Sequence, residues 1–329
     1  MLVQRTGRAT RAFRAGLVRR VPAPEELAKR KLLVLTDRDR ELLNAVYTHG
    51  FLTTELVQLA FFPATGPDGR RSPSSKAYER LRKLWLFAYL ERVELPMARS
   101  QGGRCPFLYA LGRRGVDLVT ATGGGTAAVR LRRFDRLDHV FVDHDLKSAA
   151  LWANLKALIR DEYAGRVRHF RWISERELRA RRLRVRDPQR AGRWLPFLPD
   201  GFFELRYASG MVQCVLVEID MGTLSLDRFR RKLRAFEAFL AQDLFHRSFG
   251  RSHFEVAVLT TSRRRLDHLW QATRQEVADV RWRDYQFATL DVLDPDEFPD
   301  ADWISADNEW QTLLYSVDAA EGSGQDGID

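Results

Sequence analysis

Residues 195–220 read LPFLPDGFFELRYASGMVQCVLVEID and predict two β-strands joined by a tight turn. The first expected strand, residues 197–207, is rich in aromatic and branched side chains, and the second, residues 211–220, is an almost continuous apolar run. Such a run is typical of a strand that is buried on both faces. The Ala-Ser-Gly segment at residues 208–210 favours a turn. We therefore expect a buried antiparallel hairpin.

Three carboxylates fall at the open end of this hairpin. If Ser209 is the pivot of the turn, Asp200 lies opposite Glu218. Side-chain alternation then places Asp220 on the same face as Glu218. Like charges at close range repel each other and lose hydration, so the cluster predicts a site for one divalent cation. The alternative is that Asp200 starts a turn and the other two acids end a strand in solvent.

Length and composition place the chain among globular proteins of two domains. It has 329 residues, of which 45% are hydrophobic and 30% charged. No apolar run approaches the roughly 20 residues that cross a bilayer, so we expect no membrane segment. Cys105 and Cys214 lie far apart in different contexts, which predicts neither a disulfide framework nor a zinc site. We expect a cytoplasmic protein.

The positive charge is concentrated in the first part of the chain. Residues 1–122 hold 22 Lys and Arg against 11 Asp and Glu, whereas the remainder is close to neutral. This asymmetry predicts that the first part binds a polyanion. Residues 1–32 are rich in arginine, which weakly resembles an organelle transit peptide but which we interpret as a disordered basic arm. Residues 299–329 are expected to form an acidic C-terminal tail.

Residues 33–122 have the pattern of a winged helix-turn-helix domain. Three amphipathic segments predict helices: LTDRDRELLNAVYTHG at 35–50, FLTTELVQLAFF at 51–62 and SPSSKAYERLRKLWLFAYL at 72–90. Two short extended runs, LERVELP and FLYALG, follow and are joined by a basic segment that contains two glycines. Three helices followed by a hairpin predict a helix-turn-helix unit with a wing.

In this interpretation the third helix enters the major groove of double-stranded DNA and the tip of the wing contacts the backbone or minor groove. The expected DNA-binding residues are Ser74, Ser75, Lys76, Arg80 and Lys83 on the helix, with Arg99 and Arg104 on the wing. The alternative is that these side chains form an ordinary solvated surface, on a winged helix that contacts only other proteins. The charge asymmetry favours DNA.

Four stretches resemble one bacterial protein family. They are the run at residues 35–62, SKAYERLRKLWLFAYLERV at 75–93, GGRCPFLYALGRRG at 102–115 and EIDMGTLSLDRFRRKLRAF at 218–236. In this order they resemble replication-relaxation proteins, which are encoded on plasmids and integrated mobile elements, and the resemblance covers about residues 33–265. It implies a role near DNA processing or element maintenance, with other replication or transfer proteins as candidate partners. It implies no particular reaction or oligomeric state.

After an expected linker at residues 123–141, residues 142–298 predict the element order α-β-β-β-α-β. This order resembles the restriction-endonuclease-like PD-(D/E)XK fold, so the expected fold class is mixed α+β or α/β. In this resemblance, Pro199-Asp200 would occupy the PD positions of the motif, and Glu218-Ile219-Asp220 would occupy the (D/E)XK positions. Asp220 replaces the expected lysine, which is a departure from the motif.

The nuclease resemblance implies that two carboxylates hold Mg²⁺ or Mn²⁺ while the lysine orients the nucleophile. The missing lysine puts cleavage in doubt. Lys232, on the next expected helix, is a candidate substitute, although it can equally be a solvated helix lysine. The proposed catalytic set is therefore Asp200, Glu218, Asp220 and Lys232, and the first three form the proposed metal site.

Three functional hypotheses follow from these patterns. The first is a DNA-binding protein whose second domain has a nuclease-like fold without cleavage activity and needs no metal. The second is an active, Mg²⁺-dependent endonuclease or nickase that the winged helix targets to DNA. The third is a transcriptional regulator of its own operon.

Overall fold

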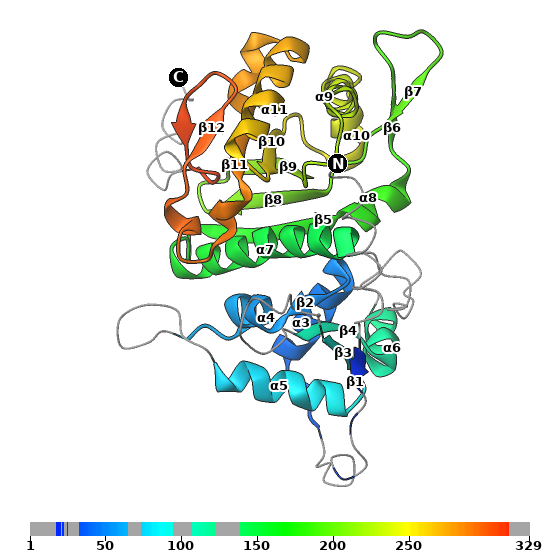
Figure 1. The fold of residues 1–329 in the computed structure, drawn as a ribbon, viewed down its shortest axis with the longest axis vertical. Coiled ribbons are helices and arrows are strands. Elements are labelled where there is room, and N and C mark those ends of the chain that lie inside the picture. The colour runs from blue at the N-terminus through cyan, green and yellow to red at the C-terminus, as the bar shows by residue number, and fades with distance from the viewer. Residues whose placement is uncertain are drawn as a thin grey trace, which may run out of the picture. The chain divides into compact units, whose positions relative to one another are not determined.

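The computed structural model describes residues 18–20, 22, 25, 33–64, 74–94, 107–122 and 139–315. The chain divides into two units, Met1–Ala153 and Asn154–Asp329 (Figure 1). It is a mixed α+β chain, which confirms the fold class expected from the sequence, and its largest sheet has seven strands. Among the residues described, no helix is both long and apolar enough to cross a membrane.

The first unit combines helices with a small antiparallel sheet. Its helices are α3 (Asp37–His49), α4 (Thr54–Phe61), α5 (Ser75–Leu86), α6 (Arg113–Ala121) and the start of α7 (His139–Asp161). Its strands are β1 (Val18–Arg20), β2 (Leu52–Thr53), β3 (Leu90–Glu94) and β4 (Phe107–Leu111), in the spatial order β1-β3-β4-β2. From α3 to β4 the chain therefore runs helix, strand, two helices and a two-stranded hairpin.

Local sequence rules explain where these helices begin and which face they bury. Thr36 caps α3 in a capping box with Asp39, and Ser74 caps α5 by accepting a hydrogen bond from the backbone of Ala77. Gly50 ends α3 with a φ of +79°, a conformation that glycine adopts without strain. The predicted apolar stripes are buried: Leu42, Leu43, Val46 and Tyr47 on α3, and Ala77, Leu81, Leu84 and Trp85 on α5.

Arg80, which the sequence predicts to contact DNA, joins α5 to the start of α3. Its Nε donates to Asp39 Oδ1 at 2.7 Å, its Nη2 donates to Asp39 Oδ2, and Nη2 also donates to the carbonyl of Val34 at 2.8 Å. The Asp39 side chain is only 1% exposed, so its charge depends on this partner. Burial alone would raise the pKa of Asp39, but hydrogen bonds from Arg80 and Thr36 outweigh burial and lower it.

The second unit is built on the seven-stranded sheet, in the order β13-β12-β11-β10-β9-β8-β5. These strands are β5 (Val167–Ser174), β8 (Gly201–Tyr207), β9 (Val212–Asp220), β10 (Glu255–Thr260), β11 (Tyr285–Thr289), β12 (Trp303–Ser305) and β13 (Trp310–Gln311). Strands β9, β10 and β11 run parallel, and the other neighbours pair antiparallel. Two helices, α9 (Leu226–Ala241) and α11 (Arg263–Glu276), lie on one face of this sheet (Figure 1).

The remaining elements of this unit are short. They are helices α8 (Glu175–Arg181) and α10 (Leu244–Phe249), the 3-10 turns η2 (Asp279–Asp284), η3 (Leu290–Leu293) and η4 (Phe298–Asp300), and strands β6 (Arg184–Arg186) and β7 (Trp194–Pro196). Strands β6 and β7 form a separate two-stranded hairpin. The first strand of the expected buried hairpin is thus interrupted, because residues 197–200 lie outside the strands of both sheets and include Pro199, which lacks a backbone donor.

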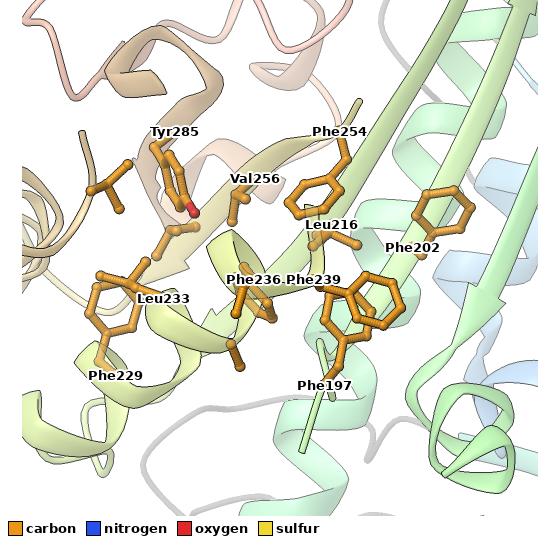
Figure 2. Close-up of a cluster of buried hydrophobic side chains, with 14 of the residues drawn as sticks. Phe197, Phe202, Leu216, Phe229, Leu233, Phe236, Phe239, Phe254, Val256 and Tyr285 are labelled. Carbon is orange, nitrogen blue, oxygen red and sulfur yellow. The ribbon is translucent and has the colours of Figure 1, made fainter. Parts of the chain in front are cut away.

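The core of the second unit lies between the sheet and α9 and α11. Phe229, Leu233 and Phe236 project from α9 toward the sheet, as their spacing predicts (Figure 2). The ring of Phe197 stacks on Phe239 with centroids 3.8 Å apart. Each buried aromatic side chain of this kind contributes roughly 2–3 kcal/mol of transfer free energy, so this interface holds α9 firmly against the sheet.

The C-terminal segment differs from the expectation of an acidic tail over residues 299–329. Strands β12 and β13 lie in that range and extend the sheet, and Trp303 and Ile304 are buried. The high acid content of this segment favoured a tail, although the segment also contains a short apolar run, β12, that pairs with β11. Residues 316–329 lie outside the described ranges.

Replacing Arg80 with alanine leaves the Asp39 carboxylate buried without its charged partner. We expect the free energy of unfolding of the first unit to fall by about 3 kcal/mol at neutral pH. Because the pKa of Asp39 is lowered in the fold, this contribution is present above the ordinary carboxyl pKa and is lost as the pH falls through the folded value. Urea unfolding followed by circular dichroism, at pH 7 and in acid, measures both effects.

The matched control is Lys83→Ala, which removes an exposed positive charge from the same helix. We expect it to change the free energy of unfolding by less than about 0.5 kcal/mol. Equal losses in the two variants would contradict a structural role for Arg80.

Candidate functional site

The β8–β9 hairpin has the predicted register. Gly201 pairs with Val217 and Arg206 with Val212, so the pairs are symmetric about residue 209. Gly210, in the turn, has a φ of +93°, which explains the glycine there. The next position beyond Gly201 is Asp200, whose backbone N–H donates to the carbonyl of Val217 at 2.9 Å. The open end of the hairpin therefore brings position 200 beside position 218, as the sequence predicts.

Asp200 and Glu218 converge on one ammonium group. Lys232 Nζ donates to Glu218 Oε2, and it lies 3.4 Å from Asp200 Oδ1. The other oxygen of Asp200, Oδ2, accepts from the backbone N–H of Ile219 at 2.8 Å, which holds this carboxylate across the hairpin. The cation that these two carboxylates face therefore comes from the middle of α9.

This ammonium stays charged and remains within reach of solvent. Burial alone would lower the pKa of Lys232, but the attraction of Asp200 and Glu218 and their hydrogen bonds outweigh burial and raise it. The Lys232 side chain is 27% exposed, against 12% for Asp200 and 5% for Glu218. The three groups form what we term the Lys232 site, in which a cationic donor covers two carboxylates near the surface.

Asp220 belongs to a separate ion pair. Arg265 Nε donates to Asp220 Oδ2 at 2.6 Å and Nη2 donates to Oδ1 at 3.3 Å, while the hydroxyl of Thr260 donates to Oδ2 at 2.9 Å. Arg265 Nη2 also donates to the carbonyl of Leu224. The expectation that Asp220 shares one cation with the other two acids is thus corrected, because Arg265 already neutralises it.

Among the described residues, no group of three or more His, Cys, Asp and Glu side chains is arranged to hold a metal ion. The three-carboxylate metal site predicted from the sequence is therefore reduced to two carboxylates, Asp200 and Glu218. Sequence reasoning missed Arg265 and Thr260, since Thr260 faces Asp220 only through the parallel pairing of β9 with β10. That pairing leaves no signal in the spacing of residues.

The residues of the first unit that the sequence predicts to bind DNA differ from one another in exposure and contacts. Ser74 caps α5 and its backbone N–H donates to Gln58 Oε1 at 3.0 Å, and Arg80 pairs with Asp39. Ser75, Lys76 and Lys83 are exposed on the outer side of α5. Arg99 and Arg104, predicted at the tip of the wing, lie outside the described residues.

Replacing Lys232 with methionine keeps most of the unbranched side chain and removes its charge. Two buried carboxylates then face each other without a cation, and we expect the free energy of unfolding to fall by about 3 kcal/mol at pH 7. The raised pKa means that the stabilisation by Lys232 is fully present below the ordinary lysine pKa and is lost as the pH rises through the folded value. Chemical unfolding at pH 7 measures the loss, and Arg231→Met, at an exposed neighbour on α9, is the control.

Protonation of the carboxylates removes the repulsion, so the deficit of Lys232→Met should shrink as the solution is acidified. A variant as stable as the wild type at pH 7 would contradict the arrangement.

Comparison with known proteins agrees with the resemblance seen in the sequence. Residues 43–252, more than half of the 329-residue chain, match the replication-relaxation family. No curated protein and no solved structure matches the chain. The matched range includes α4 and α5 of the first unit and the whole Lys232 site of the second. The family suggests a role in plasmid or mobile-element replication or relaxation, and this chain belongs to it.

Proposed function

We propose that the protein binds duplex DNA through its first unit and cuts one DNA strand at the Lys232 site. The observation that carries this proposal is the position of Lys232 Nζ between Asp200 and Glu218. Two carboxylates at the end of a buried hairpin, with a lysine beside them, are the functional set of a PD-(D/E)XK nuclease. The family's suggested role in plasmid or mobile-element replication or relaxation supports an action on DNA.

The element order from α7 to β10 supports this proposal. Helix α7, strands β5, β8 and β9, helix α9 and strand β10 follow the expected α-β-β-β-α-β order. Strands β5, β8 and β9 are antiparallel neighbours, and β10 lies parallel to β9. Helix α8 and the β6–β7 hairpin are inserted between β5 and β8.

The donor set at the Lys232 site suits Mg²⁺ or Mn²⁺. Mg²⁺ is commonly held by one or two carboxylates together with water and substrate phosphate oxygens. Asp200 Oδ1 and Glu218 Oε2 already share one cationic group, so both oxygens face a point where positive charge is stabilised. When bound there, the metal ion would lower the pKa of a coordinated water and draw charge from the phosphate.

The side chains of this chain have distinct tasks in that proposal. Asp200 and Glu218 supply the anionic oxygens. Lys232, whose pKa is raised, is a charged donor rather than a base at neutral pH, and it can stabilise negative charge on the phosphate. Arg228 lies one helical turn before Lys232 on α9 and is exposed, which adds positive charge beside the site.

A second candidate function is DNA binding without cleavage. It is favoured by the position of Asp220, which stands where the motif has lysine and is bound by Arg265. It is also favoured by the salt bridges of Lys232, because a metal ion has to compete with the ammonium for both carboxylates.

Incubation of the pure protein with supercoiled plasmid and Mg²⁺ or Mn²⁺ separates the two candidates. We expect conversion to the open circle by the wild type and at least a roughly 100-fold slower conversion by Asp200→Ala and Glu218→Gln. Asp227→Asn is the matched control, because this carboxylate lies on the same helix α9 and its side chain is 86% exposed. A wild-type protein that binds the plasmid and leaves it supercoiled in either metal would support the second candidate.

Metal binding can be tested without activity. Mg²⁺ should raise the Tm of the wild type and of Asp227→Asn, and the rise should be absent in Asp200→Ala. A Tm that does not respond to Mg²⁺ or Mn²⁺ would argue against a metal at the Lys232 site.

If duplex DNA docks on α5, removing the exposed lysines of this helix should weaken duplex binding. In the first unit, the exposed Ser75, Lys76 and Lys83 on α5 and the helix and strand order support a winged helix. A Lys76→Ala/Lys83→Ala variant should bind duplex DNA more weakly, and its salt slope should fall by up to about 2. Fluorescence anisotropy with a labelled duplex, at salt concentrations from about 50 to 200 mM, measures both the affinity and the salt slope.

The matched control is Arg40→Ala/Arg113→Ala, which removes the same charge from exposed positions on α3 and α6. If this control reduces the salt slope as much as the α5 variant does, the duplex is not read by α5.

A further inference from the structure

The β6–β7 hairpin presents an exposed tryptophan between two arginines. Trp194 is 50% exposed and pairs with Arg186 across the hairpin. The guanidinium carbons of Arg184 and Arg186 lie 5.6 and 5.7 Å from the centroid of its ring. Cation–π contacts of this kind hold the indole ring in place while leaving part of its surface to solvent. We term residues 184–196 the arginine–tryptophan hairpin.

The inner side of this hairpin is anchored in the core. Val185 and Leu195 alternate with the exposed residues and are buried among the hydrophobic side chains of the second unit. Gln242, which caps the end of α9, accepts from the backbone N–H of Arg186 at 3.2 Å and donates to its carbonyl at 3.0 Å. These contacts hold the two strands of the hairpin in place while Trp194 and the arginines face solvent.

The charge on the outer face is strongly positive. Residues 184–196 contain four arginines and one acid. Within the described part of the chain, no carboxylate forms a salt bridge with Arg184, Arg186, Arg190 or Arg193, all of which are exposed. The nearby acid Asp187 is buried and accepts from the backbone N–H of Gln189 at 3.0 Å, so it shapes the turn.

We propose that the arginine–tryptophan hairpin binds single-stranded DNA, with an unpaired base stacked on Trp194 and the arginines on its phosphates. This inference rests on the proposed function, because a protein that opens or cuts one strand must hold unpaired nucleotides. An aromatic face accepts a base only when that base is not stacked within a duplex, and a basic groove beside it accepts the backbone. Charge complementarity therefore selects a nucleic acid strand as the occupant.

The chain also limits how far this hairpin lies from the Lys232 site. Trp194 precedes Asp200 by six residues, and a fully extended chain of that length spans at most about 22 Å. A strand of a few nucleotides can bridge that span. The same strand can thus contact the hairpin while one of its phosphates lies at the carboxylates.

The test uses the full chain and two fluorescein-labelled probes, a 20-nucleotide oligo-dT and a duplex of equal length. We expect Trp194→Ala to bind oligo-dT about tenfold or more weakly, because one stacked base is lost. Trp194→Phe keeps an aromatic face and should stay within about threefold of the wild type. Neither variant should change duplex affinity by a comparable factor.

Trp310→Ala is the matched control. Trp310 lies in the same unit, is 58% exposed and has Arg263 at 5.7 Å from its ring centroid, so it resembles Trp194 in exposure and contact. Its neighbour Glu309 is acidic and pairs with Arg283, which makes that surface unsuitable for a phosphate backbone. We expect Trp310→Ala to bind oligo-dT like the wild type.

Two further measurements assign the contacts. Binding of oligo-dT should quench tryptophan fluorescence in the wild type, and the quenching should be smaller in Trp194→Phe. Arg184→Ala/Arg186→Ala should lower the salt slope for oligo-dT by up to about 1.4, since each single-strand phosphate contact adds about 0.7.

Three results would overturn this inference: no oligo-dT binding by the wild type, unchanged oligo-dT affinity in Trp194→Ala, or equal losses for oligo-dT and duplex. These outcomes are separate from those that test the proposed function. The α5 variant and the plasmid assay examine duplex binding and cleavage, and either can succeed while Trp194→Ala has no effect.

Discussion

Two carboxylates cannot stay ionised at the end of an apolar hairpin without a cation, and the second unit is arranged around that constraint. The register of β8 and β9 brings Asp200 beside Glu218. The cation comes from α9, where Lys232 stands beside the buried Leu233. Packing of the apolar face of α9 on the sheet therefore determines where the Lys232 ammonium lies, so the hydrophobic core positions the ionic site.

Other buried acids on the hairpin obey the same constraint with a different partner. Asp220 is paired with Arg265, and Glu204 accepts hydrogen bonds from Arg206 and Arg251. Burial alone would raise the pKa of Glu204, but the two guanidinium groups outweigh burial and lower it. A guanidinium fork binds a carboxylate through several fixed donors, whereas an ammonium acts as a compact point charge. The Lys232 site is thus better suited than these pairs to exchange its cation or to admit a phosphate.

Local rules made much of this fold predictable from the sequence. The turn at Ser209, the cap at Thr36 and the apolar stripe of α9 depend on residues close together in the chain, and all are found as expected. Pairs distant in sequence were not predictable. Arg80 has the spacing of an outward residue on α5, and only the folded chain brings it to Asp39, which is 41 positions away. Strand β12 was also not predicted. The acidic composition of the surrounding segment masked the short apolar run that contains the buried Trp303.

Helix α9 links the ionic site to the arginine–tryptophan hairpin. Lys232 lies within the helix and Gln242 caps its end, where it holds the backbone of Arg186. Ten residues of α-helix rise about 15 Å. The distance between the Lys232 ammonium and the Gln242–Arg186 contact is therefore set by a rigid helix. A site that acts on one nucleotide while gripping another needs such a constant spacing, because an error of about 1 Å in placing a reacting group is costly. Under the two proposals, α9 would therefore set the distance between the cleavage site and the strand-binding hairpin, with no hinge needed between them.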